Sequence, residues 1–129
     1  MNSNSWTKLA IGCVIALAAA SSCRHDPIGT ESLPSVCFTT DVLPIIQSNC
    51  AKSGCHHGLG DEVGDLRTAA VIRSIVSPGK PYDSRLYSAI TDTWGDLMPP
   101  APNAPLSRDA RTTIFVWILQ GADTSCPGL

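Results

Sequence analysis

The chain has few aromatic and few charged side chains: Phe, Trp and Tyr make up 5% of its 129 residues, and Asp, Glu, Lys and Arg make up 16%. Its formal net charge of −2 at pH 7 is not the basic excess with which proteins bind nucleic acid or recognise an anionic membrane surface. We therefore expect no nucleic-acid partner. The apolar run over residues 9–20 is too short to span a bilayer, because a membrane-spanning helix needs about 20 residues.

Residues 1–22 have the composition of a secretory signal peptide. The apolar run LAIGCVIALAAA (residues 9–20) follows a polar stretch with one basic residue, Lys8, and precedes small residues. The end of this segment, with Cys23 after Ala20-Ser21-Ser22, resembles a bacterial lipobox, in which the cysteine is lipidated. We therefore predict an exported protein that a lipid on Cys23 anchors to a bacterial membrane, on the periplasmic or outer-membrane side. The alternative is ordinary signal cleavage nearby, which leaves Cys23 as a thiol.

Residues 23–36 are expected to form a flexible tether, since RHDPIGTESLPSV (residues 24–36) contains two prolines and a glycine without a helical or strand period. One domain over residues 37–129 follows the tether. This domain is small, has few aromatic residues and has long loops, so its apolar core is expected to be thin. Domains of this kind commonly depend on a disulfide, a metal or another cofactor.

Apolar residues in this domain recur at helical rather than strand spacing, which predicts an all-α fold with about four helices. The last helix is the best defined, since Ser107 caps it, apolar residues follow at helical spacing, and Gly121 ends it. Proline and glycine in SPGK (residues 77–80) predict a type II turn. The other expected helices are one capped by Thr40 or Asp41, with Cys50 on its last turn and Gly54 after it, one over residues 67–76, and one over residues 84–90 capped by Asp83.

The segment NCAKSGCHHGLG (residues 49–60) has two cysteines, Cys50 and Cys55, with His56 directly after the second. A disulfide between these cysteines is sterically possible but explains no other feature of the chain. A zinc site would need a fourth ligand such as His57, and adjacent histidines seldom reach one ion together. Covalent haem attachment needs two thiols followed at once by a histidine, usually as C-x-x-C-H. We favour haem, with a C-x4-C-H spacing.

A second axial ligand is expected from Met98, the only methionine beyond residues 1–22. A haem that carries electrons commonly has a donor on each face of its iron, and a thioether is one of the usual donors. Met98 begins the segment MPPAPNAP (residues 98–105), whose proline rings restrict the backbone and exclude a regular helix. A lone methionine is more often a core side chain, but the Cys-His pair upstream favours a ligand here. His57 is interpreted as a loop histidine.

These features together resemble the small c-type cytochrome domains of exported bacterial proteins, including lipoproteins. The resemblance covers nearly all of residues 37–126 and rests on DVLPIIQSNCAKSGCHHG, IVSPGKPYDSRLYSAI, DLMPPAPNAPLS and IFVWILQGAD. It implies a fold like that of class I cytochrome c, in which the first and last helices cross and one covalent haem c lies between a histidine and a methionine. In this chain the resemblance implies thioether bonds from Cys50 and Cys55, and iron ligation by His56 and Met98.

The same resemblance implies a disulfide between Cys37 and Cys126, because crossed first and last helices would bring the two ends of the domain together. An exported protein is in an environment where disulfides persist. Free thiols at these two positions are the alternative.

We therefore expect a monohaem c-type cytochrome that is tethered to a membrane, transfers one electron at a time and is not an enzyme. Its partners would be other redox proteins. A peroxidase would need an open sixth position at the iron, which Met98 is expected to fill. The alternatives are a haem-based redox or gas sensor, an accessory subunit, and a haem-free structural lipoprotein in which Cys50 and Cys55 form a disulfide.

Overall fold

The computed structural model describes residues 29–58, 64–92 and 97–126. In these ranges the chain is helical and has no strand, which confirms the all-α class. Among the same residues, no helix is both long enough and apolar enough to cross a membrane. The predicted signal peptide (residues 1–22) and the lipidation site Cys23 lie outside the described residues. The elements are η1 (Thr30–Ser32), η2 (Phe38–Val42), α2 (Leu43–Asn49), α3 (Ala69–Ser74), η3 (Pro81–Asp83), α4 (Arg85–Thr91) and α5 (Arg108–Leu119).

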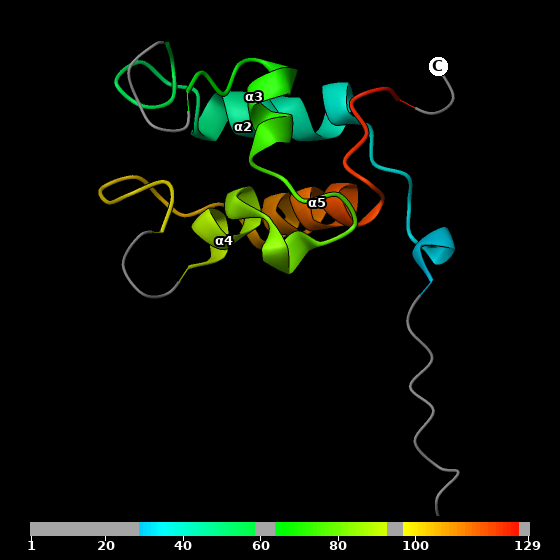
Figure 1. Cartoon of the computed structure of the whole chain (residues 1–129). Helices are drawn as coiled ribbons and strands as arrows, with labels where there is room; N and C mark the ends of the chain where they lie inside the picture. Colours follow the sequence, from blue (N-terminus) through cyan, green and yellow to red (C-terminus); the bar gives the residue numbers. More distant parts are fainter. Residues whose placement is uncertain (1–28, 59–63, 93–96, 127–129) are drawn as a thin grey trace, which may run out of the picture.

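The helices form two layers (Figure 1): α2 and α3 lie in one layer, and α4 and α5 lie in the other. Trp117 and Phe38 are the largest of the fully buried side chains in the core between them. Phe38 in η2 packs against Trp117 in α5, with ring centroids 5.3 Å apart. The start of the first helical segment is therefore held against the last helix by contact between two large apolar side chains.

Helix α5 follows the predicted pattern. The hydroxyl of Ser107 accepts a hydrogen bond of 3.1 Å from the amide of Ala110, so the predicted cap is confirmed. Gly121 follows the end of the helix with a φ of 104°, a left-handed conformation that glycine adopts without steric cost. The fully buried side chains of α5 are Ile114, Trp117 and Ile118.

The first helical segment begins earlier than predicted. Cys37 is its N-cap, so the predicted cap at Thr40 or Asp41 is wrong. Asp41 instead lies inside the segment, where its carboxylate accepts a 2.8 Å hydrogen bond from the Cys37 amide. This bond satisfies a backbone donor at the helix start, as the acidic residue of a capping box does. At the other end, Cys50 is the C-cap of α2.

The predicted cap at Asp83 is also wrong. Asp83 ends η3, and Ser84 is the N-cap of α4. The buried hydroxyl of Ser84 donates a 2.9 Å hydrogen bond to the Lys80 carbonyl and does not cap the helix. The short turn η3 brings that carbonyl back to Ser84, which a local pattern does not reveal. Helix α3 is shorter than the predicted range 67–76.

A disulfide joins Cys37 and Cys126, the pair that the resemblance implied, with Cα atoms 4.9 Å apart. The sequence separation of 89 means that the bond closes nearly the whole domain. Beside it, the Gln120 side chain accepts a hydrogen bond from the Val36 amide and donates one to the Pro34 carbonyl. Pro34 and Val36, which the sequence analysis assigns to the tether, are therefore attached to the end of α5.

Removing this disulfide in a Cys37→Ser/Cys126→Ser variant is expected to lower the free energy of unfolding by roughly 4 to 5 kcal/mol. The reason is that the bond restricts the unfolded chain within a loop of about 90 residues. Urea unfolding of the variant and the wild type, with the same cofactor content, measures the difference. A wild-type mass that does not change on reduction and alkylation would contradict the bond itself.

Candidate functional site

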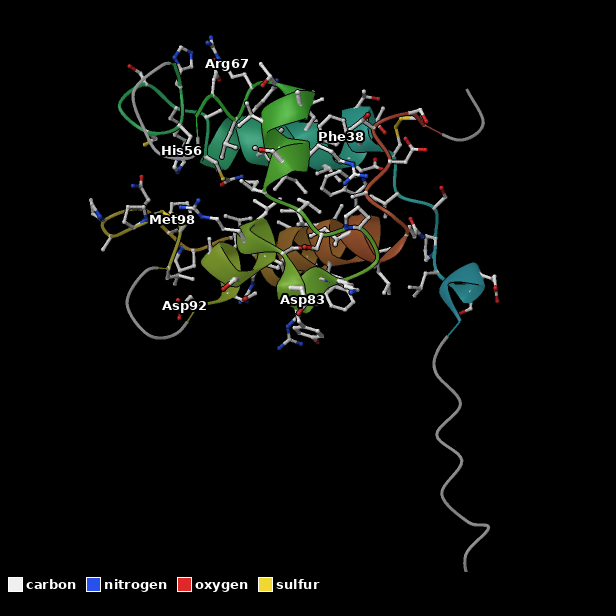
Figure 2. The ribbon with its side chains drawn as sticks, viewed as in Figure 1. Phe38, His56, Arg67, Asp83, Asp92 and Met98 are labelled. Atoms are coloured by element: carbon white, nitrogen blue, oxygen red, sulfur yellow. A yellow bond between two sulfur atoms is a disulfide. The ribbon has the colours of Figure 1, made fainter. Side chains whose placement is uncertain are left out.

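A cavity of about 640 Å³ is lined by residues of α2, of α4 and of the loops that carry His56 and Met98. Figure 2 shows these two labelled residues at the end of the molecule opposite the disulfide. The volume of the cavity falls within the range of roughly 300 to 1,000 Å³ that is usual for small-molecule and cofactor sites. Cys50, Cys55, His56 and Met98 all line it. The structure therefore brings together the four residues that the sequence assigns to a haem. The apolar wall includes Leu66, Leu86 and Ile90, all of which are buried.

The loop after α2 brings His56 back to the end of that helix. The amide of His56 donates a 3.2 Å hydrogen bond to the carbonyl of Cys50. Between them, the amide of Cys55 donates a 2.9 Å bond to the carbonyl of Lys52, which closes a tight turn. Residues 52–55 are exposed. The two residues in excess of the C-x-x-C-H spacing are thus accommodated by an outward turn, while the second cysteine and His56 remain at the cavity.

Cys50 and Cys55 are free thiols that differ in exposure. Cys50 is 8% exposed, whereas Cys55 lies at the surface. Burial raises the pKa of the Cys50 thiol, and the neighbouring Cys55 adds to this effect. The disulfide considered for this pair is not formed. In the part of the chain that the structure describes, no three Cys, His, Asp or Glu side chains gather as an ion site requires, so the zinc alternative lacks a ligand cluster there.

Met98 reaches the cavity from the opposite layer. Its amide donates a 2.8 Å hydrogen bond to the Ala89 carbonyl in α4, which fixes the start of the proline-rich loop. Further along the loop, the amide and the side-chain nitrogen of Asn103 both donate to the Pro100 carbonyl at 3.1 Å. Figure 2 shows Met98 and His56 on two loops at the same end of the molecule, one from each layer. The predicted ligands thus approach one cavity from different layers.

His57 is exposed and does not line the cavity. Its Nε2 atom lies 3.0 Å from Nη1 of Arg67 and accepts a hydrogen bond, since a guanidinium can only donate. Nε of Arg67 in turn lies 2.9 and 3.0 Å from the two carboxylate oxygens of Asp65. Figure 2 shows Arg67 on the outer side of its loop, away from Met98. The hydrogen bond to Arg67 therefore holds the His57 side chain on the outer side of the loop.

Hydrogen bonds from Arg67 lower the pKa of Asp65 to about 2, and the same contact raises the pKa of Arg67. Asp65 is therefore ionised at neutral and mildly acidic pH. The stability that this pair contributes is present above the ordinary carboxyl pKa and is lost as the pH falls toward 2. The pairing of Asp65 with Arg67 was not predicted from the sequence. The alternation in Asp65-Leu66-Arg67, with the apolar residue buried between two charges, is the pattern that could have revealed it.

No protein-family model, no curated protein and no solved structure matches this chain. A function for the site must therefore be inferred from the side chains that line it. Two thiols, an imidazole and a thioether share one largely apolar cavity, to which Arg85 and Asp92 add charges of opposite sign.

Proposed function

We propose that the protein is a monohaem c-type cytochrome that carries one electron at a time. The observation that carries the proposal is that Cys50, Cys55, His56 and Met98 line one cavity of a size suited to a cofactor. This set contains the two thiols and the adjacent histidine that haem attachment needs, together with a thioether as second ligand. A haem bound there would supply the one-electron chemistry of its iron.

The residues of the cavity suit a haem in their chemistry. Cys50 and Cys55 would hold the ring as thioethers, and His56 and Met98 would bind the iron. An apolar wall around a haem is one of the means by which a protein sets the haem potential. Because a thioether favours the reduced iron, Met98 predicts a higher potential than two histidines would give. A haem iron bound by Met98 would have no open position for peroxide, which favours an electron carrier over a peroxidase.

A cytochrome c-like arrangement of the helices is part of the same proposal. It is supported by the packing of Phe38 against Trp117, which places η2 on α5, and by the disulfide between the two ends of the domain. Export and lipid anchoring are supported by the sequence of residues 1–22 and by Cys23. Other redox proteins would then be the partners.

Production of the full chain in a bacterial host with c-haem maturation tests the proposal. The purified protein should show the absorption of a low-spin haem, and haem stain should remain with the protein on a denaturing gel. A Cys50→Ser/Cys55→Ser variant should lose the covalent stain. The matched control Cys37→Ser/Cys126→Ser, which also removes two cysteines but none at the cavity, should keep it. A colourless wild-type product would refute the proposal.

A further inference from the structure

Residues 65–67 contact the two adjacent histidines at two points. The amide of Leu66 donates a 3.1 Å hydrogen bond to the carbonyl of His56. One residue later, Nη1 of Arg67 donates to Nε2 of His57 at 3.0 Å. The first bond fixes the backbone of His56, and the second fixes the side chain of its neighbour. Together they hold the pair of histidines in one orientation relative to this segment.

Asp65 aligns Arg67 for this contact. The Arg67 amide donates a 2.9 Å hydrogen bond to the Asp65 carboxylate, in addition to the bonds from its guanidinium. A guanidinium presents a planar set of donors, so Arg67 can bind Asp65 through one edge and His57 through another. Leu66 lies between them, is 3% exposed and lines the cavity. Residues 65–67 are therefore held by burial of Leu66 on the cavity side and by the hydrogen bonds of Arg67 on the outer side.

We propose that residues 65–67 form a clamp that selects His56, and not His57, as the histidine presented to the cavity. This inference rests on the proposed haem function. Selection is needed because two imidazoles are adjacent in the sequence, and each is chemically able to bind iron. Asp65 and Arg67 do not line the cavity. They are positioning residues that act through His57, while Leu66 acts on the backbone of His56.

The clamp has a consequence in the full chain made without haem maturation. In Arg67→Ala, the amide hydrogen of Leu66 should exchange about 5-fold faster than in wild type, because the segment loses roughly one net hydrogen bond. The matched control is Arg108→Ala, which removes an exposed arginine from the first turn of α5. It should leave that rate unchanged. Equal exchange rates in wild type and Arg67→Ala would overturn the clamp.

Two substitutions at His57 separate positioning from simple loss of packing. His57→Ala removes the acceptor and should raise the Leu66 exchange rate as Arg67→Ala does. His57→Gln offers a carbonyl oxygen to Arg67 and should restore a rate near that of wild type. An exchange rate in His57→Gln as high as in His57→Ala would contradict the role of the contact between Arg67 and His57.

In the haem-loaded protein the clamp has a spectroscopic consequence. Arg67→Ala should give a second low-spin signal in electron paramagnetic resonance, from molecules in which His57 replaces His56. The share of this signal should be about 5-fold greater than in wild type, by the same loss of one hydrogen bond. Arg108→Ala should leave it unchanged, and adding His57→Ala to Arg67→Ala should remove it.

A single, unchanged signal in Arg67→Ala would refute the selection of His56. A wild-type chain that takes up no haem would refute the proposed function and, with it, selection toward iron. The exchange rate at Leu66 would still decide whether the segment is clamped, so the two failures are distinguishable.

Discussion

Replacement of Met98 by alanine is expected to change the haem-loaded protein from low spin to high spin and to lower its midpoint potential. The decrease should be on the order of 100 mV, a part of the roughly 0.8 V over which axial ligands tune haem proteins. Met98 is half-buried at the cavity that also holds His56, and its thioether would stabilise the reduced iron. Absorption spectroscopy and a redox titration of the purified protein measure both effects.

Further substitutions distinguish ligation by Met98 from the shape of its side chain. Met98→Leu keeps an apolar side chain but has no donor atom, so it should resemble Met98→Ala. Met98→His supplies another ligand and should restore a low-spin spectrum at a potential below that of wild type. Asn103→Ala removes one side-chain hydrogen bond within the same loop and should alter the potential far less. An unchanged midpoint potential in Met98→Ala would rule out Met98 as a ligand.

Replacement of Trp117 by alanine is expected to lower the free energy of unfolding by about 3 to 5 kcal/mol. Trp117 is 1% exposed and packs against Phe38, so its removal leaves a cavity where η2 meets α5. The indole Nε1 also donates a 2.8 Å hydrogen bond to the Asp123 carbonyl, which would lose its partner. Because small domains are stable by only about 5 to 15 kcal/mol, this is a large part of the total.

The matched control for this substitution is Trp117→Phe. It keeps an aromatic ring against Phe38 and loses the hydrogen bond and part of the volume, so we expect a smaller cost of about 1 to 2 kcal/mol. Urea unfolding followed by circular dichroism and by fluorescence should give coincident transitions if unfolding is two-state. A loss below about 1 kcal/mol for the alanine variant would contradict a large contribution of this contact to the stability of the core.

The features that sequence analysis predicted well are those that local chemistry determines. Ser107 caps α5 because a hydroxyl next to the first turn can reach an unpaired backbone amide. The turn at residues 77–80 forms as predicted, with Lys80 bonded to the Ser77 carbonyl at 3.0 Å and Gly79 at a φ of 74°. Both depend only on residues within a few positions of each other.

Features that depend on distant contacts were missed. Asp83 is a good cap by type, yet the buried hydroxyl of Ser84 binds the Lys80 carbonyl and α4 begins after it. The contact between His57 and Arg67 joins residues ten positions apart and follows no helical or strand period. At the site, the two cysteines, His56 and Met98 could be predicted from their residue types. The contribution of Leu66 to the cavity wall could not, because it depends on the path of the chain.

The hydrogen bonds of the Gln120 side chain determine which contacts would first resist a pulling force on the N-terminal side of the domain. At Pro34 and Val36 the Gln120 side chain holds the chain to the end of α5, and the nearby disulfide joins Cys37 to Cys126. The loops that carry His56 and Met98 lie at the end of the molecule opposite the disulfide (Figure 2). Tension on the segment before Pro34 would therefore act first on the Gln120 hydrogen bonds and then on a covalent bond. We therefore expect a pull on the residues before Pro34 to leave the geometry of the cavity unchanged as long as these bonds hold.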